Sequence, residues 1–557
     1  MTPGATILLP ALLIGAVATA AVAQPPAPPP ELPTPVFGEV VEVRVINLEV
    51  VVTDRDGLPV TGLAAGDFRL LVDGEELPVR YFTEVRGGQA IEAAAEESGA
   101  AVAGIPDVVP GSPVGTSYLV FVDDFFSIAR DRDRVLRSLS AELSRLGPED
   151  RMAIVAFDGI ELEMISTWSS SVSELERAFQ KAVKRPAHGL RRESERRSFL
   201  SGSRRMGQTG IGGMPNLPGN RLEMDERFYA ELLEDQVKST VSAAAAALRG
   251  FANPPGRKVM LMLSGGWPYD IPEYVTRQFG RAITEPQIES GDRLFAPVVE
   301  TANRLGYTLY AVDVPGLATD DVIDASEFGR TVVNEQFANF IRENNIQYGL
   351  EFVSQQTGGR AFVNAGRTAV LENAEADTRS YYWLGFVPAW QGDDRSHRVE
   401  AEVRREGLRV RNRSGYLDSS RSREVSMAVE SALMFGGGPN LRPLAALKVS
   451  TPTKSSVGNM RVNVELAVPV AELTMLPVGR QRVADLELRV AAIDERGGRN
   501  EIPVLPVRLA VESDPAPGQL AYYRTTLELR RIRNRVAVAL YDPAAGTIWS
   551  TTVEVEP

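Results

Sequence analysis

The chain has 557 residues, 44% hydrophobic and 24% charged, so it is long enough for about three or four globular domains. Its 60 basic and 73 acidic residues give a formal net charge of -13, which argues against general nucleic-acid binding. The sequence has no cysteine and only two histidines. Disulfides and thiolate chemistry are therefore excluded, and two histidines are too few for a His-rich metal centre.

The first residues predict an export signal. Residues 6–23 are continuously apolar and end in Ala21-Val22-Ala23, a small-x-small cleavage pattern, although no Lys or Arg precedes them. We therefore expect a signal peptide at 1–23 and a secreted or periplasmic, envelope-associated mature protein. Membrane contact is expected only if this segment stays uncleaved. A Pro-rich linker follows at 24–36.

The segment after the linker alternates between apolar and polar residues. Residues 37–86 contain strand-like runs separated by Asp-Gly turns, which predicts a small β-sandwich module. Residues 87–115 are rich in Ala, Gly, Glu and Pro and are predicted to be a linker.

From residue 116 the pattern changes to short apolar runs separated by helical periodicity. Uniformly apolar runs are typical of parallel strands that helices cover on both faces, and four occur at 118–124, 151–157, 258–264 and 307–314. We predict a doubly wound α/β domain at 116–390, with an Arg-, Ser- and Gly-rich surface insertion at 186–222.

The rest of the chain is predicted to be mostly β. A β-hairpin at 391–417 is expected to close the α/β domain, and 418–439 reads as a linker with a short helix. Residues 440–557 alternate again and predict a C-terminal β-sandwich.

These segments, in this order, resemble the acidobacterial-type von Willebrand factor A (VWFA)-related proteins, a family of secreted or envelope bacterial proteins. The resemblance rests on "VVVTDRDGLPVTGLAAGDFRLLVDGEELPVRYF", "QQTGGRAFVN" and "SYYWLGFVP…LRVRNRSGYL" and covers roughly residues 37–417. It implies a central von Willebrand A-like (Rossmann-like) α/β domain, flanked here by N-terminal and C-terminal β-sandwich modules.

The resemblance also implies a place for a metal-ion-dependent adhesion site, where Mg²⁺ or Ca²⁺ would bind oxygen ligands. In "YLVFVDDFFS", Asp123 matches the first aspartate of the Asp-x-Ser-x-Ser turn and Ser127 the last serine, but Phe125 replaces the middle serine. Ser264 stands where a later aspartate is expected. We therefore predict a degenerate site with no bound cofactor, in which the candidate helper ligands are Asp124, Asp158 and Asp270.

The predicted function is non-enzymatic, with no catalytic residues assigned. We expect the chain to bind an unidentified protein partner, in adhesion or another protein–protein contact, through the edge of the α/β sheet that carries Ser264 and an exposed Trp267. One alternative is a Mg²⁺- or Ca²⁺-dependent adhesion module with substituted ligands. The other is an unrecognised secreted hydrolase, since the Ser264 turn "LSGG" resembles a nucleophile turn without the flanking Gly-x-Ser-x-Gly pattern.

Overall fold

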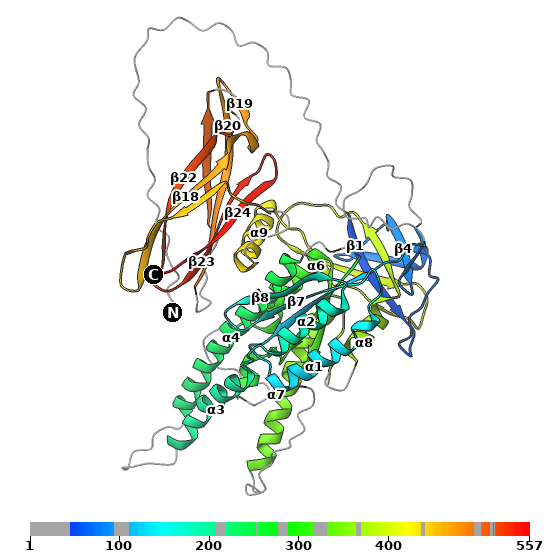
Figure 1. Cartoon of the computed structure of the whole chain (residues 1–557). Helices are drawn as coiled ribbons and strands as arrows, with labels where there is room; N and C mark the ends of the chain where they lie inside the picture. The colour runs from blue at the N-terminus through cyan, green and yellow to red at the C-terminus, as the bar shows by residue number, and fades with distance from the viewer. Residues whose placement is uncertain are drawn as a thin grey trace, which may run out of the picture.

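In the computed structural model of the protein, an α/β core lies between two groups of β-strands (Figure 1). Each group consists of two sheets that share one apolar cluster, and we call the groups the N-terminal sandwich and the C-terminal sandwich. The predicted signal peptide and the Pro-rich linker lie outside the residues that the structure describes, as do parts of the predicted linkers and of the insertion. The described residues are 45–93, 111–206, 219–251, 254, 256–276, 288–315, 331–363, 369–435, 441–494, 503–512, 516 and 518–557.

The core is built on a five-stranded sheet in the order β10-β9-β6-β7-β8, where β6, β7, β9 and β10 are parallel and β8 is antiparallel at one edge. All eight residues of β6 are buried, because this central strand is covered on both faces. The strands are β6 (Thr116–Asp123), β7 (Arg151–Phe157), β8 (Leu162–Ser169), β9 (Arg257–Ser264) and β10 (Tyr307–Asp313).

Helices cover both faces of this sheet. One face packs against α1 (Ala129–Ala141), α2 (Val172–Val183) and α8 (Val370–Thr378). The other packs against α4 (Gly219–Gly250), α6 (Gly291–Leu305) and α7 (Thr331–Gln356). Two further helices, α3 (Gly189–Met206) and α5 (Ile271–Thr276), pack against α4.

The N-terminal sandwich is made from two distant parts of the chain. Its sheets have the orders β13-β1-β11-β4-β5 and β14-β12-β2-β3, so residues 381–417 pair with residues 46–93. The strands are β1 (Ile46–Thr53), β2 (Phe68–Val72), β3 (Glu75–Leu77), β4 (Tyr81–Arg86), β5 (Gln89–Ala93), β11 (Tyr381–Phe386), β12 (Ser396–Val403), β13 (Arg409–Arg411) and β14 (Gly415–Leu417).

This pairing differs from the predicted domain boundaries. The sequence patterns place 381–386 in the α/β domain and predict that the hairpin 391–417 closes it, and β5 falls in the predicted linker 87–115. The physical reason is that β1 needs backbone partners on both sides, and it finds them in β11 and β13, more than 300 residues away in the chain. Local alternation identifies a strand without identifying its partner.

The C-terminal sandwich follows α9 (Arg421–Phe435), which lies in the predicted linker 418–439. Val425, Val429 and Leu433 of α9 are buried in the same apolar cluster as α4 and the outward faces of β20 and β23. The strands are β15 (Leu441–Arg442), β16 (Ala446–Val449), β17 (Thr453–Lys454), β18 (Asn459–Pro469), β19 (Leu476–Val478), β20 (Gln481–Asp494), β21 (Val504–Val511), β22 (Leu520–Arg530), β23 (Asn534–Asp542) and β24 (Thr547–Val555).

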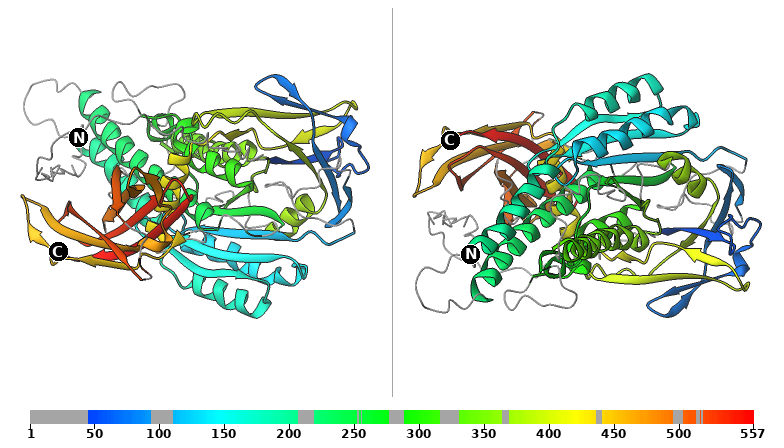
Figure 2. Two further views of the ribbon diagram at one scale, coloured as in Figure 1. Left: turned by 90° about the horizontal axis from the view of Figure 1, so that it is seen from above. Right: turned by 90° about the horizontal axis from the view of Figure 1, so that it is seen from below.

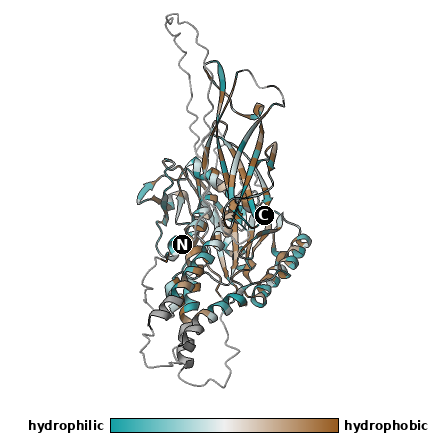
Figure 3. Ribbon diagram, turned by 90° about the vertical axis from the view of Figure 1, so that its left-hand side faces the viewer, coloured by the Kyte–Doolittle hydropathy of each residue, from teal (hydrophilic) through white to brown (hydrophobic). Residues whose placement is uncertain are grey.

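Figure 2 shows the C-terminal sandwich and the N-terminal sandwich at opposite sides of the core. Hydrophobic residues concentrate in the strands and hydrophilic residues on the outer helical surfaces (Figure 3). In the described part of the chain, no helix combines the length and apolar character that crossing a membrane requires.

The buried Tyr382 hydroxyl provides a test of whether residues 381–417 and 46–93 form one N-terminal sandwich. It donates to the carbonyl oxygen of Val60 at 2.9 Å and accepts from the Leu63 backbone N–H at 3.2 Å. Because Tyr382→Phe leaves both groups without this partner, we expect the free energy of unfolding to fall by about 1–2 kcal/mol. Urea unfolding measures the change, and Tyr522→Phe on an exposed strand is the matched control. Equal stability of the two variants would contradict the contact of Tyr382 with Val60 and Leu63 in the N-terminal sandwich.

Candidate functional site

The candidate site lies at the carboxyl ends of β6 and β9, adjacent parallel strands at which the order of the sheet switches. Asp123 ends β6, Ser264 ends β9, and both side chains are fully buried. The backbone of Gly265 approaches the turn after β6 so closely that a Cβ there would lie 2.1 Å from the Phe126 carbonyl oxygen. The two strand ends therefore form one packed unit.

The Asp123 carboxylate accepts four hydrogen bonds. Its Oδ1 atom accepts from the backbone N–H groups of Phe125 at 3.1 Å and Phe126 at 3.0 Å. Its Oδ2 atom accepts from Ser264 Oγ at 2.6 Å and from the indole Nε1 of Trp267 at 3.0 Å. Since a carboxylate has about four lone-pair sites, these donors occupy all of them.

Burial raises the pKa of Asp123 from its usual 3.8 to about 6. The hydrogen bonds from Ser264, Phe126 and Trp267 oppose the shift, because they stabilise the charged form. All of these donors are neutral, so the described residues stabilise the Asp123 carboxylate through dipoles and form no ion pair with it.

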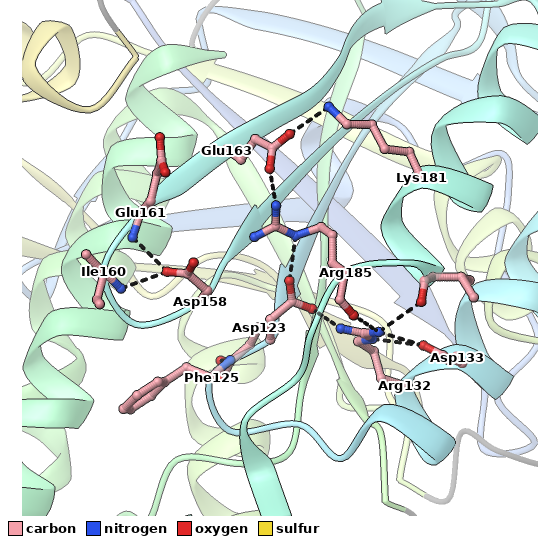
Figure 4. A network of polar contacts seen from close by, with 12 residues as sticks. Asp123, Phe125, Arg132, Asp133, Asp158, Ile160, Glu161, Glu163, Lys181 and Arg185 are labelled. Atoms are coloured by element: carbon pink, nitrogen blue, oxygen red, sulfur yellow. Dashed lines mark hydrogen bonds and ion pairs between the residues drawn. The ribbon is translucent and has the colours of Figure 1, made fainter. Parts of the chain in front are cut away.

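Asp124, unlike Asp123, is stabilised by charged partners. Its Oδ1 atom pairs with Arg132 at 2.5 Å and its Oδ2 atom with Arg185 at 2.7 Å. Arg185 also pairs with Glu163, which in turn pairs with Lys181 at 2.6 Å. Figure 4 shows this chain of ion pairs beside the end of β6. The predicted helper ligand Asp124 is therefore committed to two guanidinium groups.

The start of α3, within the predicted insertion, covers the turn after β6. The backbone N–H groups of His188 and Gly189 donate to the carbonyl oxygens of Asp124 at 2.7 Å and Ser127 at 2.9 Å. A Cβ on Gly189 would lie 2.6 Å from the Ser127 carbonyl oxygen. The turn is consequently closed off by protein rather than open to a ligand.

These residues do not fit a divalent cation. Mg²⁺ and Ca²⁺ need carboxylate and hydroxyl oxygens with free lone pairs. Asp123 has none to offer, and the buried Ser127 hydroxyl, which has no hydrogen-bond partner among the described residues, is a single neutral oxygen. The Trp267 indole N–H and the Ser264 hydroxyl donate hydrogen bonds that stabilise the negative charge of Asp123, as a bound cation would otherwise do.

The other two candidate helpers serve local turns. Asp158 accepts from the backbone N–H groups of Ile160 and Glu161, in the turn between β7 and β8 (Figure 4). Asp270 accepts from the Glu273 N–H and so caps α5. Neither carboxylate shares a hydrogen-bond donor with Asp123 among the described residues.

The predicted exposed contact surface is corrected by burial. Trp267 is 1% exposed and Ser264 is 0% exposed, so neither side chain can reach a partner directly. The indole of Trp267 packs on Phe295 with ring centroids 5.8 Å apart, while its N–H points to Asp123. The position of Trp267 just after β9 predicts an exposed loop at the sheet edge. The loop instead directs the indole inward, because the buried Asp123 carboxylate needs hydrogen-bond donors.

Sequence reasoning also missed Arg132 and Arg185. Arg132 is fully buried on α1 within "RDRDRV", although charges at successive positions are typical of a solvated helix face. Its Nη2 atom pairs with Asp133 at 2.8 Å and donates to the Arg185 carbonyl oxygen at 2.9 Å. The signal was the pair of carboxylates at 123 and 124, since the second one also requires a counter-charge.

Comparisons with known proteins leave the family unassigned. No protein-family model matches the sequence, and no curated protein matches it. Among solved structures, a protein from Archaeoglobus fulgidus is similar at 9% identity and a TM-score of 0.14, over 20% of this chain and 97% of that one. A Bacteroides uniformis beta-glucuronidase is similar at 10% identity and a TM-score of 0.15, over 31% of this chain and 18% of the glucuronidase chain. Likeness this slight carries no argument about fold or function.

The raised pKa of Asp123 makes a pH-dependent prediction. The folded state binds the Asp123 proton more tightly than the unfolded state, so this group's contribution to stability is present below about pH 4 and is lost as pH rises to about 6. We expect wild type to lose up to about 3 kcal/mol relative to Asp123→Asn over that range. Urea unfolding at several pH values measures the difference.

The control for that series is Asp485→Asn, because the Asp485 side chain is 75% exposed. Its stability difference from wild type should stay constant between pH 4 and 6. A constant difference for Asp123→Asn as well would contradict the burial of an ionisable carboxyl at the end of β6.

The Asp124 ion pairs predict a large cost for losing one cation. Arg132→Met leaves a buried carboxylate with one guanidinium instead of two, and we expect destabilisation of about 3–5 kcal/mol. Arg130→Met is the matched control, because the Arg130 side chain is 81% exposed. Thermal unfolding of both variants decides the point, and equal midpoints would refute a structural role for Arg132.

Proposed function

We propose that the chain is an exported, non-enzymatic protein that binds another protein, and that its α/β core is a von Willebrand A-like scaffold with a metal-free, closed edge. The single observation that carries this proposal is the saturation of Asp123 by four protein donors. A mostly parallel sheet between two layers of helices supports the proposed scaffold.

The closed edge moves the proposed contact surface away from Ser264 and Trp267. In the C-terminal sandwich, β21 pairs with β20 and β22 pairs with β18, so each has an open side among the described strands. Tyr522 on β22 is 62% exposed and Val504 on β21 is 44% exposed. Open strand edges present unpaired backbone groups that an extended partner segment can complete, so we propose strand addition at β22.

The two alternative functions have less support. Metal-dependent adhesion with substituted ligands requires helper carboxylates that join Asp123. Asp124 is instead paired with Arg132 and Arg185, while Asp158 and Asp270 accept hydrogen bonds in the β7–β8 turn and at the start of α5. A hydrolase requires an accessible nucleophile, whereas the Ser264 hydroxyl is buried and donates to Asp123.

Site-specific photo-cross-linking tests the proposed function in cells that express the chain. A photoreactive side chain at position 522 should give discrete cross-linked protein species, since a partner strand on β22 would lie against it. Position 58 provides the control, because Leu58 is 64% exposed but lies in the N-terminal sandwich. Chelation of divalent ions should leave the cross-links at 522 unchanged.

Two outcomes would contradict the proposal. Cross-links of equal yield at 522 and 58 would show collision rather than binding at β22. Cross-links that disappear both on chelation and in Asp123→Asn would instead favour the metal-dependent adhesion module.

A further inference from the structure

A second group of potential ligands lies in the N-terminal sandwich, far along the chain from Asp123. Asp393 precedes β12, His397 is the second residue of β12, and Asp418 directly follows β14. One ligand atom from each lies within 4.8 Å of the others. The antiparallel pairing of β12 with β14 brings them together, since it places His397 opposite Tyr416.

The imidazole of His397 is held in one orientation. Its Nδ1 atom lies 2.7 Å from Asp73 Oδ2, and the other oxygen of Asp73 accepts the Arg398 backbone N–H at 2.9 Å. The ring stacks on Tyr416 with centroids 5.0 Å apart and planes 16° from parallel. A carboxylate beside Nδ1 accepts its proton, which leaves the lone pair of a neutral imidazole on Nε2.

That Nε2 atom has no hydrogen-bond partner in the part of the chain that the structure describes, although it is covered from solvent. The nearest carboxylate oxygen recorded for it is Asp393 Oδ1, at 4.0 Å. This separation is too long for a hydrogen bond. It is about half an ångström longer than the distance between two ligands of a tetrahedral zinc ion, each about 2.0–2.2 Å from the metal, so ion binding would draw the two side chains together.

Asp418 supplies the second independent observation. The residue is 1% exposed, and its carboxylate accepts the backbone N–H groups of Gln391 at 2.7 Å and Gly392 at 3.0 Å. Among the described residues it forms no ion pair, so a buried negative charge faces neutral donors alone. Each of its oxygens retains a lone pair, and a cation would compensate its charge.

Asp393 lies on the solvent side of this group. Its side chain is 26% exposed, and Oδ1 accepts the Arg395 backbone N–H at 3.0 Å. The exposed Arg395 side chain lies 3.6 Å from Oδ2, a surface ion pair that a bound metal ion would replace. The exposed side gives an entry path for an ion and room for water to complete its coordination.

We propose that Asp393, His397 and Asp418 bind a divalent transition-metal ion, for which Zn²⁺ is the best match. One imidazole nitrogen and two carboxylate oxygens are ligands that Zn²⁺ accepts, whereas Mg²⁺ and Ca²⁺ prefer oxygen alone. Asp73 is a positioning residue that acts through His397. The bound ion ties the segment before β12 to Asp418, three residues before α9 begins, and so fixes the junction between the N-terminal sandwich and the helix that leads to the C-terminal one.

Calorimetric titration of Zn²⁺ into the metal-stripped, untagged full chain tests the proposal. We expect one site, with a matching rise in the thermal midpoint, and loss of both in His397→Ala. His188→Ala is an unusually clean control, because the chain has only two histidines and no cysteine. Asp393→Asn changes a partly exposed side chain, so it reports on the site even if His397→Ala does not fold.

Two further variants sharpen the result. Asp73→Asn should weaken Zn²⁺ binding by about 10–100-fold without abolishing it, as expected for a partner of a metal-bound histidine. Asp123→Asn should leave binding unchanged. The proposal is overturned if wild type takes up no Zn²⁺, or if Asp393→Asn binds as tightly as wild type. In the first case His397 is an ordinary ion-pairing histidine between Asp73 and Asp393.

Discussion

A fully buried carboxylate at the end of the central strand is the constraint on which the rest of the core depends. Removing Asp123 from water without compensation would cost several kcal/mol. The chain compensates it with backbone donors from the turn that follows β6 and with side-chain donors at and just after the end of β9. The same four contacts therefore hold two adjacent strand ends together and fix the path of the chain beyond each of them.

Adjacent carboxylates at this edge are stabilised in two different ways. Asp123 faces neutral dipoles, whereas Asp124 faces two guanidinium groups that link α1 and the end of α2 to the sheet. With the start of α3 lying over the intervening turn, both charges are internal. An edge built in this way is a structural element.

Local sequence patterns predict most strands of the core, but they do not predict which distant strands pair or which side chains contact one another. The four apolar runs coincide with β6, β7, β9 and β10, because a strand buried on both faces has a composition of its own. The pairing of β1 with β11 and β13 could not be read in the same way, since a strand's partner leaves no mark on its local alternation. Asp123 could be selected from its position after a strand, but the turn of Trp267 toward it depends on three-dimensional burial. The helix face that contains Arg132 likewise has the composition of a solvated one.

Trp267 and Ser264 donate to Asp123 at positions where a bound cation would otherwise lie. A crystal structure of the full chain soaked in Mn²⁺, with an anomalous difference map, tests it most directly. We expect no Mn²⁺ peak within about 2.0–2.3 Å of Asp123, with the Trp267 indole nitrogen still in hydrogen-bond contact with Oδ2. A peak bound by Asp123 and Ser127, with the indole displaced, would contradict it and restore the metal-dependent adhesion site.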